Sequence, residues 1–116
     1  MLKGETLEKK KEVVHILAEC VIACNHCFSS CLEEEDVKMM KDCIRLDKEC
    51  AEVCQFTIGM LHKSRFAGQY LDLCIQVCEA CAEECGKHDN EHCKMCAEVC
   101  KKCAETCREF GQMFHK

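Results

Sequence analysis

Sixteen cysteines in a chain of 116 residues are the groups best able to do chemistry. Most of them follow one another at intervals of four and three residues, and the spacing C-x3-C-x2-C-x3-C occurs three times. Because such intervals keep side chains on one face of an α-helix, each run predicts a stripe of thiols along a helix. The candidate metal ligands are Cys20, Cys24, Cys27, Cys31, Cys43, Cys50, Cys54, Cys74, Cys78, Cys81, Cys85, Cys93, Cys96, Cys100, Cys103 and Cys107.

The same periodicity predicts the helices that must position these thiols. Thr6 and Asp36 are candidate N-caps, and Gly86 follows the third stripe as a C-terminal glycine. Two of the three connections are short, which favours antiparallel neighbours. We therefore expect an all-α fold with one domain over residues 1–116, an antiparallel up-down-up-down four-helix bundle with a Cys-lined core. The expected helices span about residues 6–32, 37–62, 68–85 and 90–114.

Composition and charge restrict the environment and the partners of the chain. A formal net charge of −5 argues against nucleic acid as a partner. The charged N-terminus does not resemble an export signal, and no apolar run approaches the length of a membrane span. The sequence therefore predicts a cytoplasmic protein with no membrane partner, in a compartment where thiols stay reduced or bind metal.

A core of thiols favours Cu(I) as the bound metal, because soft thiolate ligands select it. Cβ atoms at positions i and i+4 lie about 5–6 Å apart, close to the separation of about 4.6 Å between two sulfurs joined linearly through one metal by bonds of about 2.3 Å. Each Cu(I) replaces one thiol proton and leaves the core neutral, so about one ion per cysteine can bind. We predict storage and sequestration of multiple Cu(I) ions, and no catalytic constellation indicates an enzyme.

Other uses of the cysteines remain open at this point. A zinc-binding protein would need closed sets of four ligands, which usually lie on loops. A thiol/disulfide redox protein would need an exposed pair of low pKa. A further alternative is a disulfide scaffold. Another is a purely structural core, in which buried cysteines pack as small apolar side chains.

An internal repeat identifies two inward positions that are not cysteines. A shift of 54 residues lays the first stripe onto the third, and a shift of 53 residues places Met40 and Asp47 where the fourth helix has cysteines. Met40 is therefore a candidate thioether ligand. A hard carboxylate suits Cu(I) poorly, so we expect Asp47 to hydrogen-bond or to meet Arg45 or Lys48 near the surface.

The two ends of the expected bundle differ. One end brings together Met40, the weaker candidate Met39, and the candidate ligands His88 and His92, and we expect copper to enter there. The opposite end is expected to be plugged by apolar side chains. These are Val13, Leu17, Phe56, Met60, Leu61, Phe66, Tyr70, Phe110 and Phe114.

Three strings resemble the bacterial cytosolic copper storage proteins. They are ACNHC at 23–27, CIRLDKEC at 43–50, and ECGKHD at 84–89 followed by HC at 92–93. The resemblance covers about residues 18–110 and includes residues between the cysteines. It implies a bundle filled with Cu(I), a homo-oligomer that is usually a tetramer, and an entrance at the histidine-bearing end. Relatives often carry further cysteines where this chain has Val13, Leu17 and Leu71, so fewer copper sites are expected at that end.

Overall fold

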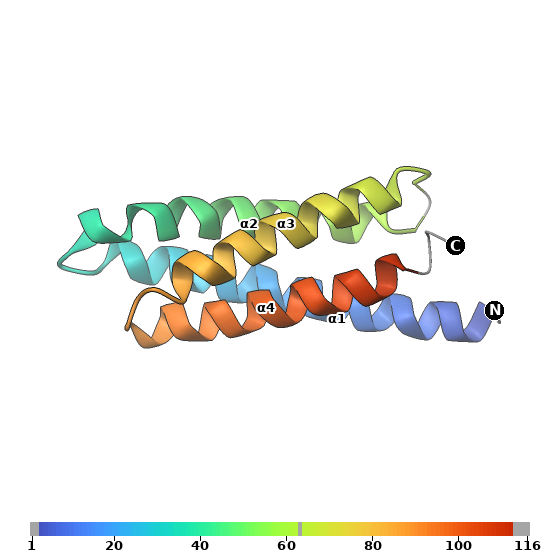
Figure 1. Cartoon of the computed structure of the whole chain (residues 1–116), viewed down its shortest axis with the longest axis horizontal. Coiled ribbons are helices and arrows are strands. Elements are labelled where there is room, and N and C mark those ends of the chain that lie inside the picture. Colours follow the sequence, from blue (N-terminus) through green and yellow to red (C-terminus); the bar gives the residue numbers. More distant parts are fainter. Residues whose placement is uncertain (1–2, 63, 113–116) are drawn as a thin grey trace.

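The computed structural model describes residues 3–62 and 64–112, with side chains from Leu7 onward. Four α-helices account for most of the described chain, and a short 3-10 helix, η1, precedes the second of them (Figure 1). The elements are α1 (Lys3–Leu32), η1 (Val37–Met40), α2 (Lys41–Met60), α3 (Ala67–Cys85) and α4 (Glu91–Gly111).

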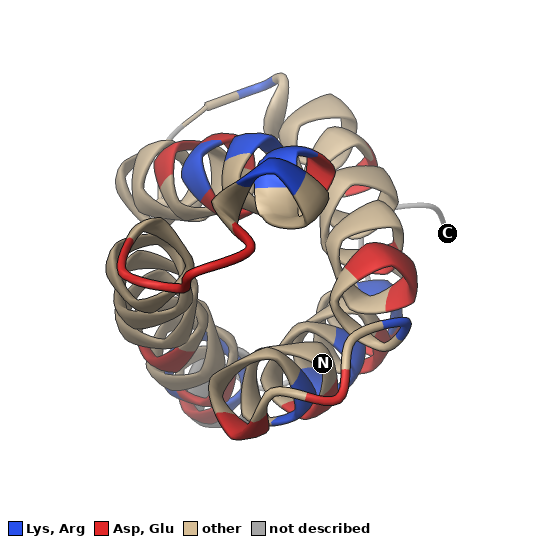
Figure 2. Cartoon of the chain, turned by 90° about the vertical axis from the view of Figure 1, so that its left-hand side faces the viewer, with Lys and Arg blue, Asp and Glu red and all other residues tan. Residues whose placement is uncertain are grey.

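The helices run up, down, up and down along an elongated body of 52 × 21 × 19 Å. Each helix contacts its two neighbours, α1 with α2 and α4 and α3 with α2 and α4, and within the described residues no Cα pair approaches within 8 Å across either diagonal. Viewed from the end where α1 and α3 finish, the four helices surround a common axis (Figure 2). The predicted all-α, antiparallel four-helix bundle is confirmed.

The three largest differences from the expected helix boundaries lie at the start of α1, the start of α2 and the end of α4. Helix α1 begins at Lys3, so Thr6 lies inside it and is not its N-cap. Asp36 precedes η1 and forms no side-chain capping bond. After Asp36 the chain turns through this 3-10 segment, where the Met39 amide donates a hydrogen bond to the Asp36 carbonyl. Helix α2 therefore starts only at Lys41. Helix α4 ends at Gly111, and Phe114, where its end was expected, lies outside the described residues.

Gly86 ends α3 for a different reason from the one expected. Its φ of −64° is right-handed, so it does not form the left-handed cap typical of glycine. A Cβ built on Gly86 would instead lie 3.0 Å from the Ala82 carbonyl oxygen, which accepts a hydrogen bond from the Gly86 amide. A close approach of backbone therefore favours glycine here.

The core has a sulfur-lined part and an apolar part. The apolar part lies toward the chain termini, where Val13, Leu17, Leu61, Leu71 and Phe110 are buried. Two of the expected plugging residues lie outside the core instead. Phe56 is 52% and Phe66 is 45% exposed. The Phe56 ring packs edge-on against the half-buried Tyr70, at a centroid distance of 5.2 Å.

One segment is longer and more apolar than expected from the sequence, in a way that a membrane span and a buried core helix share. Leu7–Leu32 is long enough to cross a membrane, and its most apolar 18-residue window has a mean hydropathy of 1.4. The polar residues Asn25 and Ser29 interrupt its apolar runs but do not lower this average below the level of a membrane span. The cysteines of this helix contribute to the hydropathy and face the other three helices, as in the core helix of a bundle.

Candidate metal centre

All sixteen cysteines are free thiols, and none is more than 1% exposed. Their stripes on α1, α2, α3 and α4 converge on the bundle axis because the helical period places each stripe on the face that packs against the neighbouring helices. The thiols therefore form one continuous sulfur column in the interior. The structure contains no cystine among these residues, so a disulfide scaffold does not describe this arrangement.

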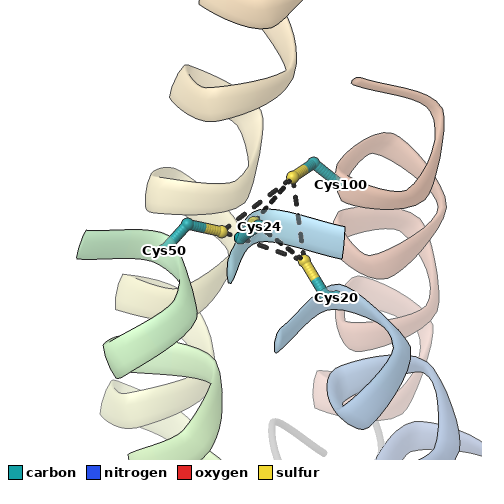
Figure 3. A group of neighbouring side chains, drawn as sticks. All are labelled: Cys20, Cys24, Cys50 and Cys100. Carbon is teal, nitrogen blue, oxygen red and sulfur yellow. Dashed lines mark hydrogen bonds between the residues drawn. The ribbon is translucent and has the colours of Figure 1, made fainter. Parts of the chain in front are cut away.

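Near the middle of the column, Cys20, Cys24, Cys50 and Cys100 lie close together (Figure 3). They come from α1, α2 and α4. The Cys20 sulfur is 3.9 Å from that of Cys24, 3.8 Å from that of Cys50 and 3.7 Å from that of Cys100. Cys24 and Cys100 are 3.6 Å apart. Four thiols from three helices can thus offer their sulfurs to one metal ion.

These separations fit three-coordinate binding better than the linear clip expected between i and i+4 thiols. A metal at the centre of an equilateral triangle of sulfurs with edges of about 3.9 Å lies about 2.3 Å from each sulfur, the length of a metal–thiolate bond. The i,i+4 pairs Cys27–Cys31 and Cys96–Cys100 have sulfurs 3.8 and 3.9 Å apart, shorter than a linear bridge requires. A third sulfur from a facing helix completes such triangles.

A second group of ligand atoms lies at the end where α1 and α3 finish. We call Cys27, Cys31, Cys43, Cys93 and His92 the mouth cluster. The Cys43 sulfur is 3.9 Å from each of those of Cys27, Cys31 and Cys93. His92 Nδ1 is 3.5 Å from the Cys27 sulfur, 3.6 Å from that of Cys93 and 4.0 Å from that of Cys31. The structure therefore brings His92 to the thiols.

The two predicted histidine ligands have different surroundings. The Nε2 atom of His92 is 2.8 Å from Glu34 Oε2, so a carboxylate holds the ring with Nδ1 toward the sulfurs. His88 Nε2 is 3.0 Å from Glu84 Oε2, and among the described residues no sulfur lies within hydrogen-bonding distance of His88. Spacing alone made the two histidines equivalent candidates. Glu34 had no signal in the sequence, since it lies in an acidic turn that resembles a solvated loop.

The two methionines at the same end, Met39 and Met40, differ in their exposure to solvent. Met40 is the last residue of η1 and is 1% exposed. Its thioether therefore lies in the core, at the level of the first turn of α2. Met39 is 72% exposed and points outward. The internal repeat therefore distinguished the inward methionine from the outward one.

Asp47 corrects an expectation, because it does not approach the surface. It is fully buried, and its Oδ1 atom accepts hydrogen bonds of 3.4 Å from the thiols of Cys81, Cys85 and Cys96. Arg45 and Lys48 pair with other carboxylates, those of Asp42 and Glu52. Asp47 also belongs to a set of possible metal ligands with Cys27, Cys31 and Cys43. The repeat, which places Asp47 at a cysteine position, was the signal for this burial.

Burial raises the pKa of the Asp47 carboxyl to about 10, and the electrostatic influence of the nearby ionisable Cys96 adds to the shift. The folded protein therefore keeps this carboxyl protonated at neutral pH, whereas the unfolded chain ionises it near pH 4, the usual value of about 3.9. Since the folded state binds the extra proton, its stability falls as the pH rises from about 4 to about 10.

We expect Asp47→Asn to stabilise the metal-free protein by about 2–4 kcal/mol at pH 7, because the amide keeps the shape without the ionisation cost. Guanidinium unfolding under reducing conditions at pH 5, 7 and 8 measures the effect, and the gain should grow with pH. Asp42→Asn, at an exposed position of the same helix, is the matched control. A gain independent of pH would contradict the assignment.

The thiols of the mouth cluster differ in the direction in which their surroundings shift the pKa. Burial, followed by charge on Cys43, raises the pKa of Cys31 and raises that of Cys93 to about 12. Hydrogen bonds from Cys27 and Cys85 lower the pKa of Cys43. A metal ion that binds this cluster must therefore release protons from buried thiols.

Fold and site together define a helical bundle whose interior is lined by metal-binding thiols. A family model described as copper storage protein matches residues 6–112. The chain therefore belongs to the copper storage protein family, which confirms the resemblance seen in the sequence.

Individual relatives agree with this assignment. The cysteine-rich protein YhjQ of Bacillus subtilis is 50% identical over 79 residues, which cover 67% of this chain and 73% of YhjQ. The Cu(I)-bound copper storage protein BsCsp3, from the same organism, is 43% identical with a TM-score of 0.84, over 89% of this chain and 98% of that one. A cytosolic copper storage protein from Streptomyces lividans with five coppers is 34% identical, with a TM-score of 0.90, over 94% and 97% of the two chains.

Proposed function

We propose that this protein stores Cu(I) in the sulfur column of its bundle. The observation that carries the proposal is the burial of sixteen free thiols with neighbouring sulfurs 3.2–4.0 Å apart. Membership of the copper storage protein family and the Cu(I)-bound state of BsCsp3 support it. All sixteen cysteines act as ligands, each sulfur bridging neighbouring ions, with His92, Met40 and His88 as further ligands at the mouth.

Charge balance explains why the ion is monovalent. Sixteen bare thiolates in a dry core would be prohibitively costly, whereas each Cu(I) that replaces a proton leaves the core neutral. The column therefore accepts ions until their number approaches the number of sulfurs. Storage of this kind needs no reacting substrate, and we assign the protein a binding role rather than an enzymatic one.

The working environment follows from the same chemistry. We place the protein in the cytosol, where reductants keep the thiols free, and the Streptomyces lividans relative is described as cytosolic. The outer face of α1 carries Ile22, 69% exposed, beside the half-buried Val21 and Phe28, which suits contact between copies. We propose a homo-oligomer, a tetramer by family resemblance, with no nucleic-acid or membrane partner.

Anaerobic titration with Cu(I) in a competing chelator tests the storage role. We expect saturation at about sixteen ions per chain, because one ion per thiol keeps the core neutral. The double variant Cys50→Ser/Cys100→Ser should lose about two or more ions, since each sulfur bridges neighbouring ions. Glu49→Ser, at an exposed position of α2, is the control. Saturation at three or four ions would contradict the proposal.

Copper enters at the mouth cluster in this proposal, because there a nitrogen and several sulfurs meet near solvent. The same titration, followed in time, separates the two histidines. His92→Ala should slow uptake while leaving most of the capacity, and His88→Ala should have a smaller effect because its ring bonds Glu84. Equal uptake rates for His92→Ala and the unmodified protein would remove the mouth cluster as the entrance.

A further inference from the structure

The mouth cluster contains a set of four ligand atoms with nearly tetrahedral spacing. The sulfurs of Cys27, Cys31 and Cys93 are 3.8, 3.8 and 3.9 Å apart. Nδ1 of His92 lies 3.5, 3.6 and 4.0 Å from them. These four residues form one of the candidate metal sets of the protein, and all their ligand atoms lie within 4.8 Å of one another.

The spacing matches a tetrahedral zinc site with three thiolates and one imidazole. Zn–S bonds of about 2.3 Å and a Zn–N bond of about 2.05 Å at tetrahedral angles require S···S distances of about 3.8 Å and N···S distances of about 3.6 Å. Five of the six observed separations lie within about 0.1 Å of these values, and only the Cys31–His92 separation is longer. Cu(I) accepts fewer ligands, so a closed set of four favours a divalent ion.

Glu34 provides an independent indication. Its Oε2 atom is 2.8 Å from His92 Nε2, on the side of the ring opposite the sulfurs. A carboxylate that accepts the second ring N–H is the usual outer partner of a zinc-bound histidine, since it fixes the tautomer and aims the free nitrogen at the metal. His88 has a carboxylate partner but no sulfur nearby, so the described residues offer this combination only at His92.

The net charge of the occupied site favours the mouth over the middle of the sulfur column. Zn²⁺ with three thiolates and a neutral imidazole carries one negative charge. His92 and Cys93 lie in the first turn of α4, where the helix dipole favours an anion, whereas Cys31 lies in the last turn of α1, where it does not. The set of Cys20, Cys24, Cys50 and Cys100 would carry two negative charges with Zn²⁺, in the buried middle of the column. Of these two sets, the one at the mouth is therefore the better site for a divalent ion.

Cys43 is the competing fourth ligand, because its sulfur is 3.9 Å from each of the three thiols. It would add a further negative charge. Its sulfur also lies 3.2 Å from that of Cys85 and donates to Asp47, so it is engaged with the next layer of the column. Imidazole is thus the better fourth ligand on both charge and position.

We propose that the metal-free protein binds one Zn²⁺ per chain at the mouth, through Cys27, Cys31, Cys93 and His92, with Glu34 as the partner that orients the histidine. The ion occupies the entrance of the copper store. Cu(I) must displace it to reach these three thiols.

Co²⁺ titration of the anaerobic, reduced, metal-free protein tests the site, because tetrahedral Co²⁺ gives intense visible d–d bands. We expect these bands to saturate at one equivalent per chain and to vanish on addition of one equivalent of Zn²⁺. Weak octahedral bands, or tetrahedral bands that grow beyond several equivalents per chain, would overturn the proposal.

Variants assign the ligands. Cys93→Ser and His92→Ala should each weaken Co²⁺ binding by at least about 100-fold, and Glu34→Gln by about 10–100-fold. Cys107→Ser, in the same stripe at the opposite end of α4, is the control and should leave the affinity unchanged. If Cys43→Ser abolishes the bands while His92→Ala does not, the assignment of His92 is wrong.

The Cu(I) capacity of each variant keeps this test separate from that of copper storage. A variant that loses Co²⁺ binding but still takes up many Cu(I) ions is folded and has lost the mouth site. Loss of the copper store with an intact Co²⁺ spectrum would instead contradict the proposed function alone.

Discussion

Saturation with Cu(I) is expected to raise the midpoint of thermal unfolding by more than about 20 °C. A ligand that binds only the folded state at a free concentration of about 1,000 times its Kd stabilises that state by about 4 kcal/mol. For a domain of about this size, each kcal/mol shifts the midpoint by about 4–8 °C. Even one tightly held ion therefore gives a shift of about 16–32 °C, and the column offers many such sites.

The physical reason is that each ion joins thiols from different helices. Cys20 of α1, Cys50 of α2 and Cys100 of α4 have sulfurs 3.7–4.0 Å apart, so an ion bound among them links three helices that otherwise meet through weak S–H contacts. Unfolding must break metal–sulfur bonds as well as apolar packing. The unfolded chain also binds Cu(I) through isolated thiols, which reduces the shift but does not reproduce the preformed clusters.

Differential scanning calorimetry of anaerobic apo and loaded protein measures this effect. Removal of copper with a strong chelator should return the midpoint to the apo value. Mg²⁺ is the control, because a hard ion has no affinity for thiols. Coincident melting curves for apo and loaded protein would show that copper does not bind in the core.

The second large effect concerns the apolar end of the metal-free bundle. Leu17 and Leu71 are fully buried, on α1 and α3, and they belong to the part of the core that is filled by hydrocarbon rather than by thiols. We expect Leu17→Ala and Leu71→Ala each to destabilise the apo protein by about 2–5 kcal/mol, through lost burial and the cavity left behind. This is a large share of the total stability of a small domain, which is about 5–15 kcal/mol.

Urea unfolding under reducing, metal-free conditions measures the loss. Leu73→Ala is the matched control, since Leu73 also lies on α3 but is 50% exposed, and it should change stability by less than about 1 kcal/mol. Copper loading should restore the thermal stability of both core variants, because the metal sites lie along the rest of the axis. Equal losses for Leu71→Ala and Leu73→Ala would show that this end is not a packed core.

Prediction from sequence succeeded where periodicity alone decides the outcome. Steps of four and three placed the thiols on one face of each helix, and an interior of four such faces requires a closed bundle. The helix ends were less accurate, because Thr6 lies inside α1 and Asp36 precedes η1 without a side-chain capping bond. The aromatic residues Phe56 and Phe66 were placed in the core on hydrophobicity alone, which does not fix the face on which a residue lies.

The particular surroundings of the polar residues could not be predicted. Asp47 was expected near Arg45 or Lys48, whereas burial gave it three thiol donors from α3 and α4. His88 and His92 were equal candidates. The structure separates them because His92, in the first turn of α4, lies close to the sulfurs of Cys27 and Cys31, whereas His88 lies in the connection before α4 and pairs with Glu84. Such contacts join residues far apart in the chain, so no local pattern records them.

The sequence by itself determined that four helices would line an interior with sulfur, since the period of the α-helix converts cysteine spacing directly into a face. Only the tertiary structure decided how far apart the sulfurs of different helices lie, which carboxylates hold the histidines, and which residues close the apolar end. Those features depend on the distance and rotation between packed helices, which arise from the packing of side chains across their interfaces rather than from the order of residues along any one of them.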